Sequence, residues 1–131
     1  MTTSVMEMIG KARARVDLVT PAAAAEEHAS GSAVLVDVRQ AAEWEHGHIE
    51  GAVPAPRGLL EFFADPASPR HKPELDPSKR LIMVCASGAR AALAAAALLD
   101  MGYTDVALLD GGQAAWQEAG LPTTEHTYAG I

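Results

Sequence analysis

Short apolar runs that alternate with helical stretches are the feature that most constrains the fold of this chain. The clearest run is residues 81–85 (LIMVC), which carries no charged side chain and indicates a strand covered on both faces. An alanine- and leucine-rich helix is expected over residues 88–101, and Gly102 ends it as a left-handed cap. Strands joined to helices by short loops predict an α/β layered domain with a parallel sheet.

Further strands and helices continue this alternation along the chain. We expect strands over residues 16–19, 33–38, 52–55 and 106–109, and helices over residues 5–14, 22–28, 40–45, 58–64 and 112–119. Thr20 and Pro21 have the residue types of a helix cap and a first helical position. We assign residues 1–14 to an N-terminal helical extension and residues 15–131 to the domain itself.

Length, charge and cysteine content narrow the classes of function. At 131 residues the chain fits one domain, and its net charge of −7 argues against a nucleic-acid partner, which needs a basic face. No stretch approaches the roughly 20 apolar residues that cross a bilayer, and no secretory signal is evident, so we expect no membrane contact and a cytoplasmic location. A single cysteine excludes an intrachain disulfide and any CxxC motif.

That cysteine, Cys85, stands where an open α/β sheet binds ligands, beyond the carboxyl end of a strand. Four small residues follow it, and the helix starts among them: Ala86, Ser87, Gly88 and Ala89. Such a loop can turn backbone N–H groups inward as an anion nest, the helix N-terminus adds partial positive charge, and Arg90 can close the cradle. These effects favour a thiolate nucleophile. The alternative is a buried strand-end cysteine without chemistry.

Three ordered motifs resemble those of the single-domain rhodanese-like sulfurtransferase family. Residues 85–90 (CASGAR) resemble its active-site loop. Residues 37–39 (DVR), 43–44 (EW) and 47–52 (GHIEGA) together resemble its first signature. Residues 109–112 (LDGG), 115–116 (AW) and 119–122 (AGLP) resemble its C-terminal signature. The resemblance covers residues 37–122, and three motifs in this order make it specific.

The resemblance implies a rhodanese-like fold, with a five-stranded parallel sheet flanked by helices on both faces and the cysteine after the fourth strand. It implies that Cys85 takes sulfane sulfur from thiosulfate, a polysulfide or glutathione persulfide and holds it as a persulfide. Cyanide or another thiol, including a protein thiol, then removes that sulfur. Because the chain has no second cysteine, the acceptor must come from solution. We expect no cofactor and no metal; the oligomeric state is left open.

Several residues around these motifs have two interpretations each. Asp37 and Arg39 either support the site or form a structural ion pair with each other or with Glu43. Arg57 either meets an anionic donor at the rim or is an ordinary surface arginine. His48 is expected to hydrogen-bond the backbone, and residues 111–112 to serve the turn into the last helix.

Two rival functions are compatible with these residues. Cysteine phosphatases and arsenate reductases use the same kind of sheet with one more residue between cysteine and arginine, whereas this loop has six residues from Cys85 to Arg90. A catalytically idle rhodanese-like module used for binding or sensing is the other alternative, although such modules usually lose the cysteine. Ala86 stands where many relatives have a bulky or charged residue, which leaves room for a larger donor.

Overall fold

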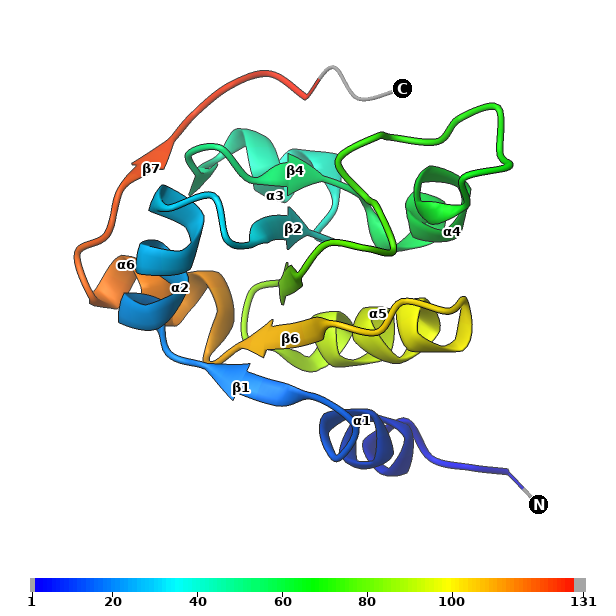
Figure 1. Ribbon diagram of the computed structural model, residues 1–131. Helices are drawn as coiled ribbons and strands as arrows, with labels where there is room; N and C mark the ends of the chain where they lie inside the picture. Colours follow the sequence, from blue (N-terminus) through cyan, green and yellow to red (C-terminus); the bar gives the residue numbers. More distant parts are fainter. Residues whose placement is uncertain (1, 129–131) are drawn as a thin grey trace.

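A sheet of five parallel strands lies between two layers of helices in the computed structural model, which describes residues 2–128 (Figure 1). The strand order across the sheet is β1-β6-β5-β2-β4. The strands of this sheet are β1 (Asp17–Val19), β2 (Val34–Asp37), β4 (Val53–Pro54), β5 (Leu81–Val84) and β6 (Val106–Leu109). The predicted fold class is confirmed, and Cys85 directly follows the fourth of these strands along the chain.

The helices lie close to their expected positions. They are α1 (Val5–Arg13), α2 (Pro21–Ala29), α3 (Ala41–Glu45), the 3₁₀ turn η1 (Arg57–Leu59), α4 (Leu60–Ala64), α5 (Ala89–Asp100) and α6 (Gly112–Glu118). Thr20 caps α2 as predicted, because its Oγ1 accepts the N–H of Ala23 at 3.2 Å. Gly102, at φ +105°, follows the end of α5 with the predicted positive φ.

Alternate side chains of β5 enter the two helical layers, because a strand turns successive side chains to opposite faces. Leu81 and Met83 join the core formed with α1, α4 and α5. Ile82 and Val84 join a second core with residues of α2, α3 and α6. Cys85 continues the alternation and belongs to the first core, so its side chain lies on the α1, α4 and α5 side of the sheet.

A second, two-stranded sheet was not predicted. In it β3 (His48–Ile49) pairs antiparallel with β7 (Thr123–Thr124), which ties the segment after α6 to the loop after α3. Strands of two residues are too short to show an alternating pattern in the sequence.

Helix α1 packs against α5 and buries Ala12, so the N-terminal helix contributes to the same core as Cys85. The chain connecting α4 to β5 has no helix or strand, yet Leu75 within it is fully buried. Tyr103 holds this connection, since its hydroxyl lies 2.7 and 2.8 Å from the carbonyl oxygens of Ala64 and Leu75, which share its one proton. None of the helices in residues 2–128 has the length and apolar character that a bilayer crossing requires.

Candidate active site

The loop after β5 lies at the point where the winding of the sheet reverses. From β5 the chain continues through α5 to β6 on one side, whereas from β2 it continues to β4 on the other side. Loops that diverge in this way leave a crevice at the carboxyl ends of the strands, where open α/β sheets bind ligands. Cys85 follows β5 at this crevice, and Arg39 follows β2. A hydrogen bond of 2.9 Å from Val38 N–H to the Val84 carbonyl joins the two segments.

The Cys85 sulfur lies inside its own loop. The side chain is buried, and Sγ accepts the backbone N–H of Gly88 at 3.0 Å. Gly88 has φ +120°, a conformation that residues with a Cβ rarely adopt, and this geometry folds the loop back over the sulfur. Ala89 then begins α5, so the sulfur also lies near the positive end of a helix of twelve residues.

Helix α6 fixes the orientation of the loop from the other side of the sheet. The N–H groups of Gln113 and Ala114 donate to the carbonyls of Cys85 and Ala86 at 2.8 and 3.2 Å. In a trans peptide the C=O and N–H point in opposite directions. The N–H groups of the next residues, Ala86 and Ser87, are therefore turned away from α6 and toward the layer that holds the cysteine side chain.

This close approach requires glycine at position 112. A Cβ on Gly112 would lie 2.5 Å from the Cys85 carbonyl oxygen and 2.8 Å from that of Ala86. Gly112 also has φ +61°, which disfavours any other residue. The glycine pair serves the predicted turn into α6, but it also admits the backbone of the cysteine loop, a role that the sequence did not indicate.

Arg90 closes one side of the loop through a two-pronged ion pair with Glu43. Its Nη1 and Nη2 donate to the two carboxylate oxygens at 2.7 and 3.0 Å. The Arg90 bond lowers the pKa of Glu43 to about 2, with help from the Gln40 N–H and from the charge of Arg39, while burial opposes the shift. The Glu43 hydrogen bonds raise the pKa of Arg90, against desolvation, and the nearby charges of Cys85 and Asp37 raise it further.

Asp37 and Arg39 form a buried ion pair with each other, one of the two predicted alternatives. Arg39 Nη2 lies 2.9 Å from Asp37 Oδ2 and also donates to the Gly47 carbonyl at 2.8 Å. The Asp37 carboxylate accepts the backbone N–H of Arg39 as well. The pair therefore anchors the end of β2 to the loop before β3. Whether it also supports the chemistry of Cys85 stays a prediction.

A model of the Rhodanese-like domain family matches residues 20–119 of the chain. The chain belongs to this family. The matched segment contains Cys85, Arg90, Glu43 and the Asp37–Arg39 pair, while helix α1 lies outside it.

Curated relatives of this rhodanese-like chain include proteins named tRNA uridine(34) hydroxylase. The protein of Chlamydia felis is 38% identical over 89 residues, which make up 66% of this chain and 26% of the relative. The protein of Chlamydia muridarum is 40% identical over 86 residues, 63% of this chain and 25% of the relative. The chain thus spans about a quarter of the length of these relatives.

Solved structures resemble the rhodanese-like chain over most of its length. A protein of unknown function from Rhodopseudomonas palustris, described as a possible tyrosine phosphatase, has a TM-score of 0.87 at 39% identity and covers 95% of this chain and 96% of its own. A rhodanese-related protein from Thermoplasma volcanium has a TM-score of 0.67 at 25% identity, over 84% and 99% of the two chains. A thiosulfate sulfurtransferase from Pseudomonas aeruginosa shares the fold, with a TM-score of 0.75 at 23% identity, and the match covers 92% of this chain and 22% of that protein.

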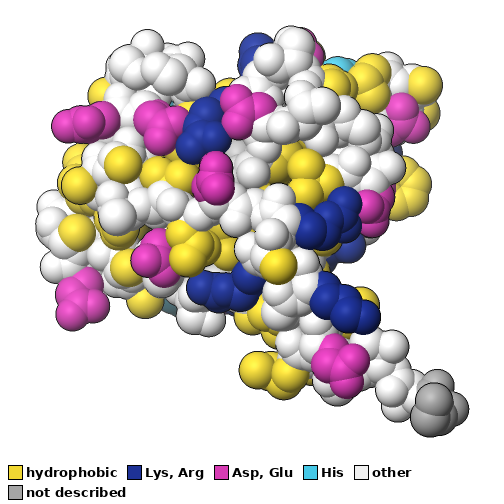
Figure 2. Space-filling view, turned by 60° about the horizontal axis from the view of Figure 1, so that its bottom comes forward, with side chains coloured by type: hydrophobic (Ala, Val, Ile, Leu, Met, Phe, Trp, Pro, Cys, Tyr) yellow, Lys and Arg dark blue, Asp and Glu magenta, His cyan; other side chains and the backbone are white. Residues whose placement is uncertain are grey.

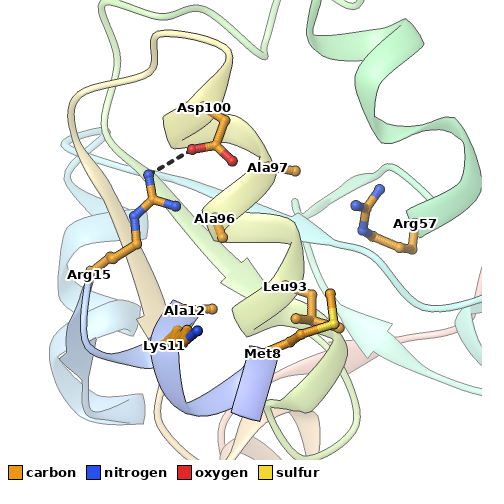
Figure 3. A pocket seen from close by; sticks show the side chains of 9 residues that line it. All are labelled: Met8, Lys11, Ala12, Arg15, Arg57, Leu93, Ala96, Ala97 and Asp100. Carbon is orange, nitrogen blue, oxygen red and sulfur yellow. Dashed lines mark hydrogen bonds and ion pairs between the residues drawn. The ribbon is translucent and has the colours of Figure 1, made fainter. Parts of the chain in front are cut away.

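The predicted rim residue Arg57 lies in a groove beside α5, where it pairs with Glu61 at 2.8 Å. This groove of about 390 Å³ runs between α1 and α5, and its lining does not include Cys85 (Figure 3). Figure 3 shows Arg15 and Arg57 on opposite sides of it, with Arg15 bonded to Asp100. Contact of Arg57 with a sulfur donor therefore stays a prediction.

His48 of the first signature and the nearby His46 differ in exposure. His48 is buried, stacks on Trp44 with the ring centroids 3.4 Å apart, and donates from Nδ1 to the Trp44 carbonyl at 2.9 Å, which confirms the predicted backbone bond. His46 is exposed. Within residues 2–128 no three His, Cys, Asp or Glu side chains come together as a metal site would need.

Two contacts made by polar residues of this domain were not predicted from the sequence. Glu43 pairs with Arg90, 47 positions away, which no local spacing indicates. Gln113 is buried at the start of α6, and within the described residues its Oε1 has no hydrogen-bond partner. Its backbone N–H holds the Cys85 carbonyl, so the residue contacts the loop through its main chain.

Proposed function

We propose that this rhodanese-like domain is a sulfurtransferase that carries sulfane sulfur as a persulfide on Cys85. The observation that carries the proposal is the sulfur of Cys85 enclosed by its six-residue loop, with the Gly88 N–H directed at Sγ from 3.0 Å. An N–H at that distance stabilises an anionic sulfur, and the start of α5 adds positive potential at the same place.

In the loading step the Cys85 thiolate attacks the sulfane sulfur of a small-molecule donor such as thiosulfate. A bond forms between Sγ and the sulfane sulfur, and the S–S bond of thiosulfate breaks. The electron pair of the broken bond leaves with sulfite, and the negative charge of the thiolate reappears on the outer sulfur of the persulfide. A glutathione persulfide or polysulfide donor loses its outer sulfur in the same way.

In the unloading step an acceptor nucleophile attacks the outer sulfur. Cyanide takes it as thiocyanate, and an external thiol, including one on a protein, takes it as a new persulfide. The Cys85 thiolate is the leaving group in both cases, so the domain returns to its starting state. Because the chain has one cysteine, an intramolecular disulfide cannot release the sulfur.

Arg90 supplies positive charge beside the loop in both steps. Its pKa lies above the ordinary arginine value, chiefly because of its bonds to Glu43, so it remains protonated. The two-pronged geometry fixes the guanidinium in one orientation. Arg90 thus contributes to the cradle, while Glu43 positions it.

The deciding experiment measures the intact mass of the purified protein after exposure to thiosulfate or glutathione persulfide, with Cys85→Ala as the control. We expect the wild type to gain the mass of one sulfur atom, to lose it when cyanide is added, and the variant to gain nothing. No gain with any donor would refute the sulfurtransferase proposal and leave the idle binding or sensing module as the explanation.

The other activities named among the relatives fit this chain less well. A phosphatase loop of this type needs room for a tetrahedral oxyanion, whereas here Gly88 N–H closes on the sulfur itself within a six-residue loop. The name of the hydroxylases gives tRNA as their substrate, but this chain aligns with only about a quarter of their length. Its net charge of −7 also disfavours binding to the negatively charged backbone of a nucleic acid. Hydrolysis of p-nitrophenyl phosphate that depends on Cys85 would favour the phosphatase instead.

A further inference from the structure

Arg13, near the end of α1, extends over the loop that holds Cys85. Its Nη1 lies 3.6 Å from the point that a Cβ on Gly88 would occupy. Gly88 is the residue whose N–H donates to Cys85 Sγ, so the Arg13 guanidinium lies at the outer surface of the sulfur-binding turn. The two residues are 75 positions apart in the chain, and the packing of α1 on α5 brings them together.

The position of Arg13 on its helix accounts for this reach. Ile9 and Ala12 pack against the core that also contains Cys85, and Arg13 follows Ile9 by one helical turn. Its side chain therefore leaves the helix along the edge of the packed face. Lys11 lies on the other edge, where it lines the groove of Figure 3.

Arg13 also differs from the other arginines around the site in the partners of its guanidinium group. Arg90 is paired with Glu43, Arg39 with Asp37 and Arg57 with Glu61. Within residues 2–128 Arg13 makes no ion pair and no side-chain hydrogen bond, and it is exposed. Figure 2 shows Lys and Arg side chains beside apolar patches on the face that carries the N-terminal segment. Arg13 therefore offers an uncompensated positive charge at the Cys85 loop of an otherwise acidic protein.

We propose that Arg13 is a substrate-positioning residue that binds the anionic end of the sulfur donor, such as the oxyanion group of thiosulfate. The inference rests on the proposed function of Cys85. In the loading step the oxyanion group departs as sulfite, so a guanidinium beside Gly88 holds the donor while its sulfane sulfur faces Sγ. The residue lies outside the segment 20–119 that defines the family, so α1 adds donor selectivity to a common core.

A pair of alkylating reagents tests this role without any sulfur transfer. Iodoacetate and iodoacetamide have nearly the same shape, but iodoacetate carries a negative charge, and Cys85 is the one cysteine that either can modify. We expect Arg13→Gln to slow alkylation by iodoacetate about fivefold, the upper end for one exposed charge interaction, and to leave iodoacetamide unchanged. Arg13→Lys should retain most of the preference for iodoacetate.

Lys11→Gln is the matched control, because it removes one positive charge from the same helix on the edge facing away from the loop. It should leave both alkylation rates near those of the wild type. Equal slowing of both reagents in Arg13→Gln, or the same effect in Lys11→Gln, would overturn the proposal in favour of a structural or long-range effect. Unchanged rates in Arg13→Gln would overturn it as well.

Steady-state kinetics with thiosulfate and cyanide extend the test to the donor. Arg13→Gln should raise the KM for thiosulfate about fivefold and leave the KM for cyanide unchanged. If the wild type forms persulfide but this variant keeps the wild-type KM for thiosulfate, Arg13 has no positioning role. If the wild type forms no persulfide, the proposed function fails, and the reagent pair still decides whether Arg13 attracts anions to Cys85.

Discussion

Gly112→Ala is the substitution with the sharpest expected effect on the cysteine loop. The added Cβ would lie 2.5 Å from the Cys85 carbonyl oxygen, so α6 and the loop must separate. Separation breaks the bonds from Gln113 and Ala114 to the loop carbonyls, each worth about 1 kcal/mol net. The left-handed backbone at φ +61° costs alanine about another 1 kcal/mol. We therefore expect the free energy of unfolding to fall by about 3 kcal/mol.

Gly120→Ala is the matched control for this experiment. Gly120 also has a positive φ, +74°, but a Cβ there meets nothing within 4 Å. This variant carries the backbone strain alone and should lose about 1 kcal/mol. Effects of alanine on the unfolded chain are the same for both variants and cancel in the comparison.

Urea denaturation and thermal unfolding measure the difference. The melting temperature of Gly112→Ala should lie about 8 °C below that of Gly120→Ala, and persulfide loading of Cys85 should fall in Gly112→Ala only. Equal stability and equal loading of the two variants would refute the reasoning that contact between α6 and the loop carbonyls sets the geometry of the site.

Two pH-dependent predictions concern groups whose pKa the fold shifts. Arg90 holds the pKa of Glu43 near 2 instead of 4.5, so the stabilisation from this pair is complete above about pH 4.5 and disappears as the pH falls through 2. The side chains of Arg90 and Glu43 are 40% and 35% exposed, so in urea denaturation the wild type should be more stable than Glu43→Gln by at most about 1 kcal/mol at pH 7. This difference should vanish by pH 2, and a difference that does not change with pH would contradict the pairing. Burial raises the pKa of Tyr103 from 10.0 to about 12, so its contribution is complete below pH 10 and lost as the pH rises through 12. Tyr103→Phe should lower the free energy of unfolding by about 1 to 2 kcal/mol at pH 7, because the carbonyls of Ala64 and Leu75 lose their donor. In urea denaturation the variant should also be less sensitive to pH between 10 and 12, and an unchanged pH dependence would contradict this role of Tyr103.

The sequence predicted the sheet well where apolar runs are continuous. Residues 81–85 and 106–109 have no competing interpretation, and the structure places β5 and β6 there. Strands β2 and β4 are shorter than the predicted ranges 33–38 and 52–55, because their pairing continues beyond the strand ends only as single hydrogen bonds, such as Ala55 N–H to the Asp37 carbonyl at 2.8 Å. Pairing of β3 with β7 depends on where the chain returns after α6, which no local pattern specifies.

The site divides in the same way between local and distant contacts. The cysteine, its small-residue loop and the following helix are consecutive, so their chemistry could be inferred from the sequence. Partners that come from elsewhere could not, since they depend on which elements meet in space. The sequence predicts Glu43 as an alternative partner of Arg39, whereas in the structure Glu43 binds Arg90, and Arg13 reaches the loop through the packing of α1 on α5. The close approach of Gly112 to the carbonyls of Cys85 and Ala86 likewise depends on how α6 packs on the loop, so the sequence did not indicate it.

The anchoring of the Cys85 and Ala86 carbonyls by α6 has a consequence for the energetics of the proposed cycle. Thiolate and persulfide each carry one negative charge, which loading moves from Sγ to the outer sulfur, so the N–H groups of the loop face an anion in both states. A loop held in place by these two hydrogen bonds is an advantage under that condition, because its dipoles need little reorientation between the two halves of the cycle. Because Cys85 returns to its starting state in each cycle, the direction of sulfur flow depends on the donor and acceptor and on their concentrations, whereas the fixed loop affects the rate.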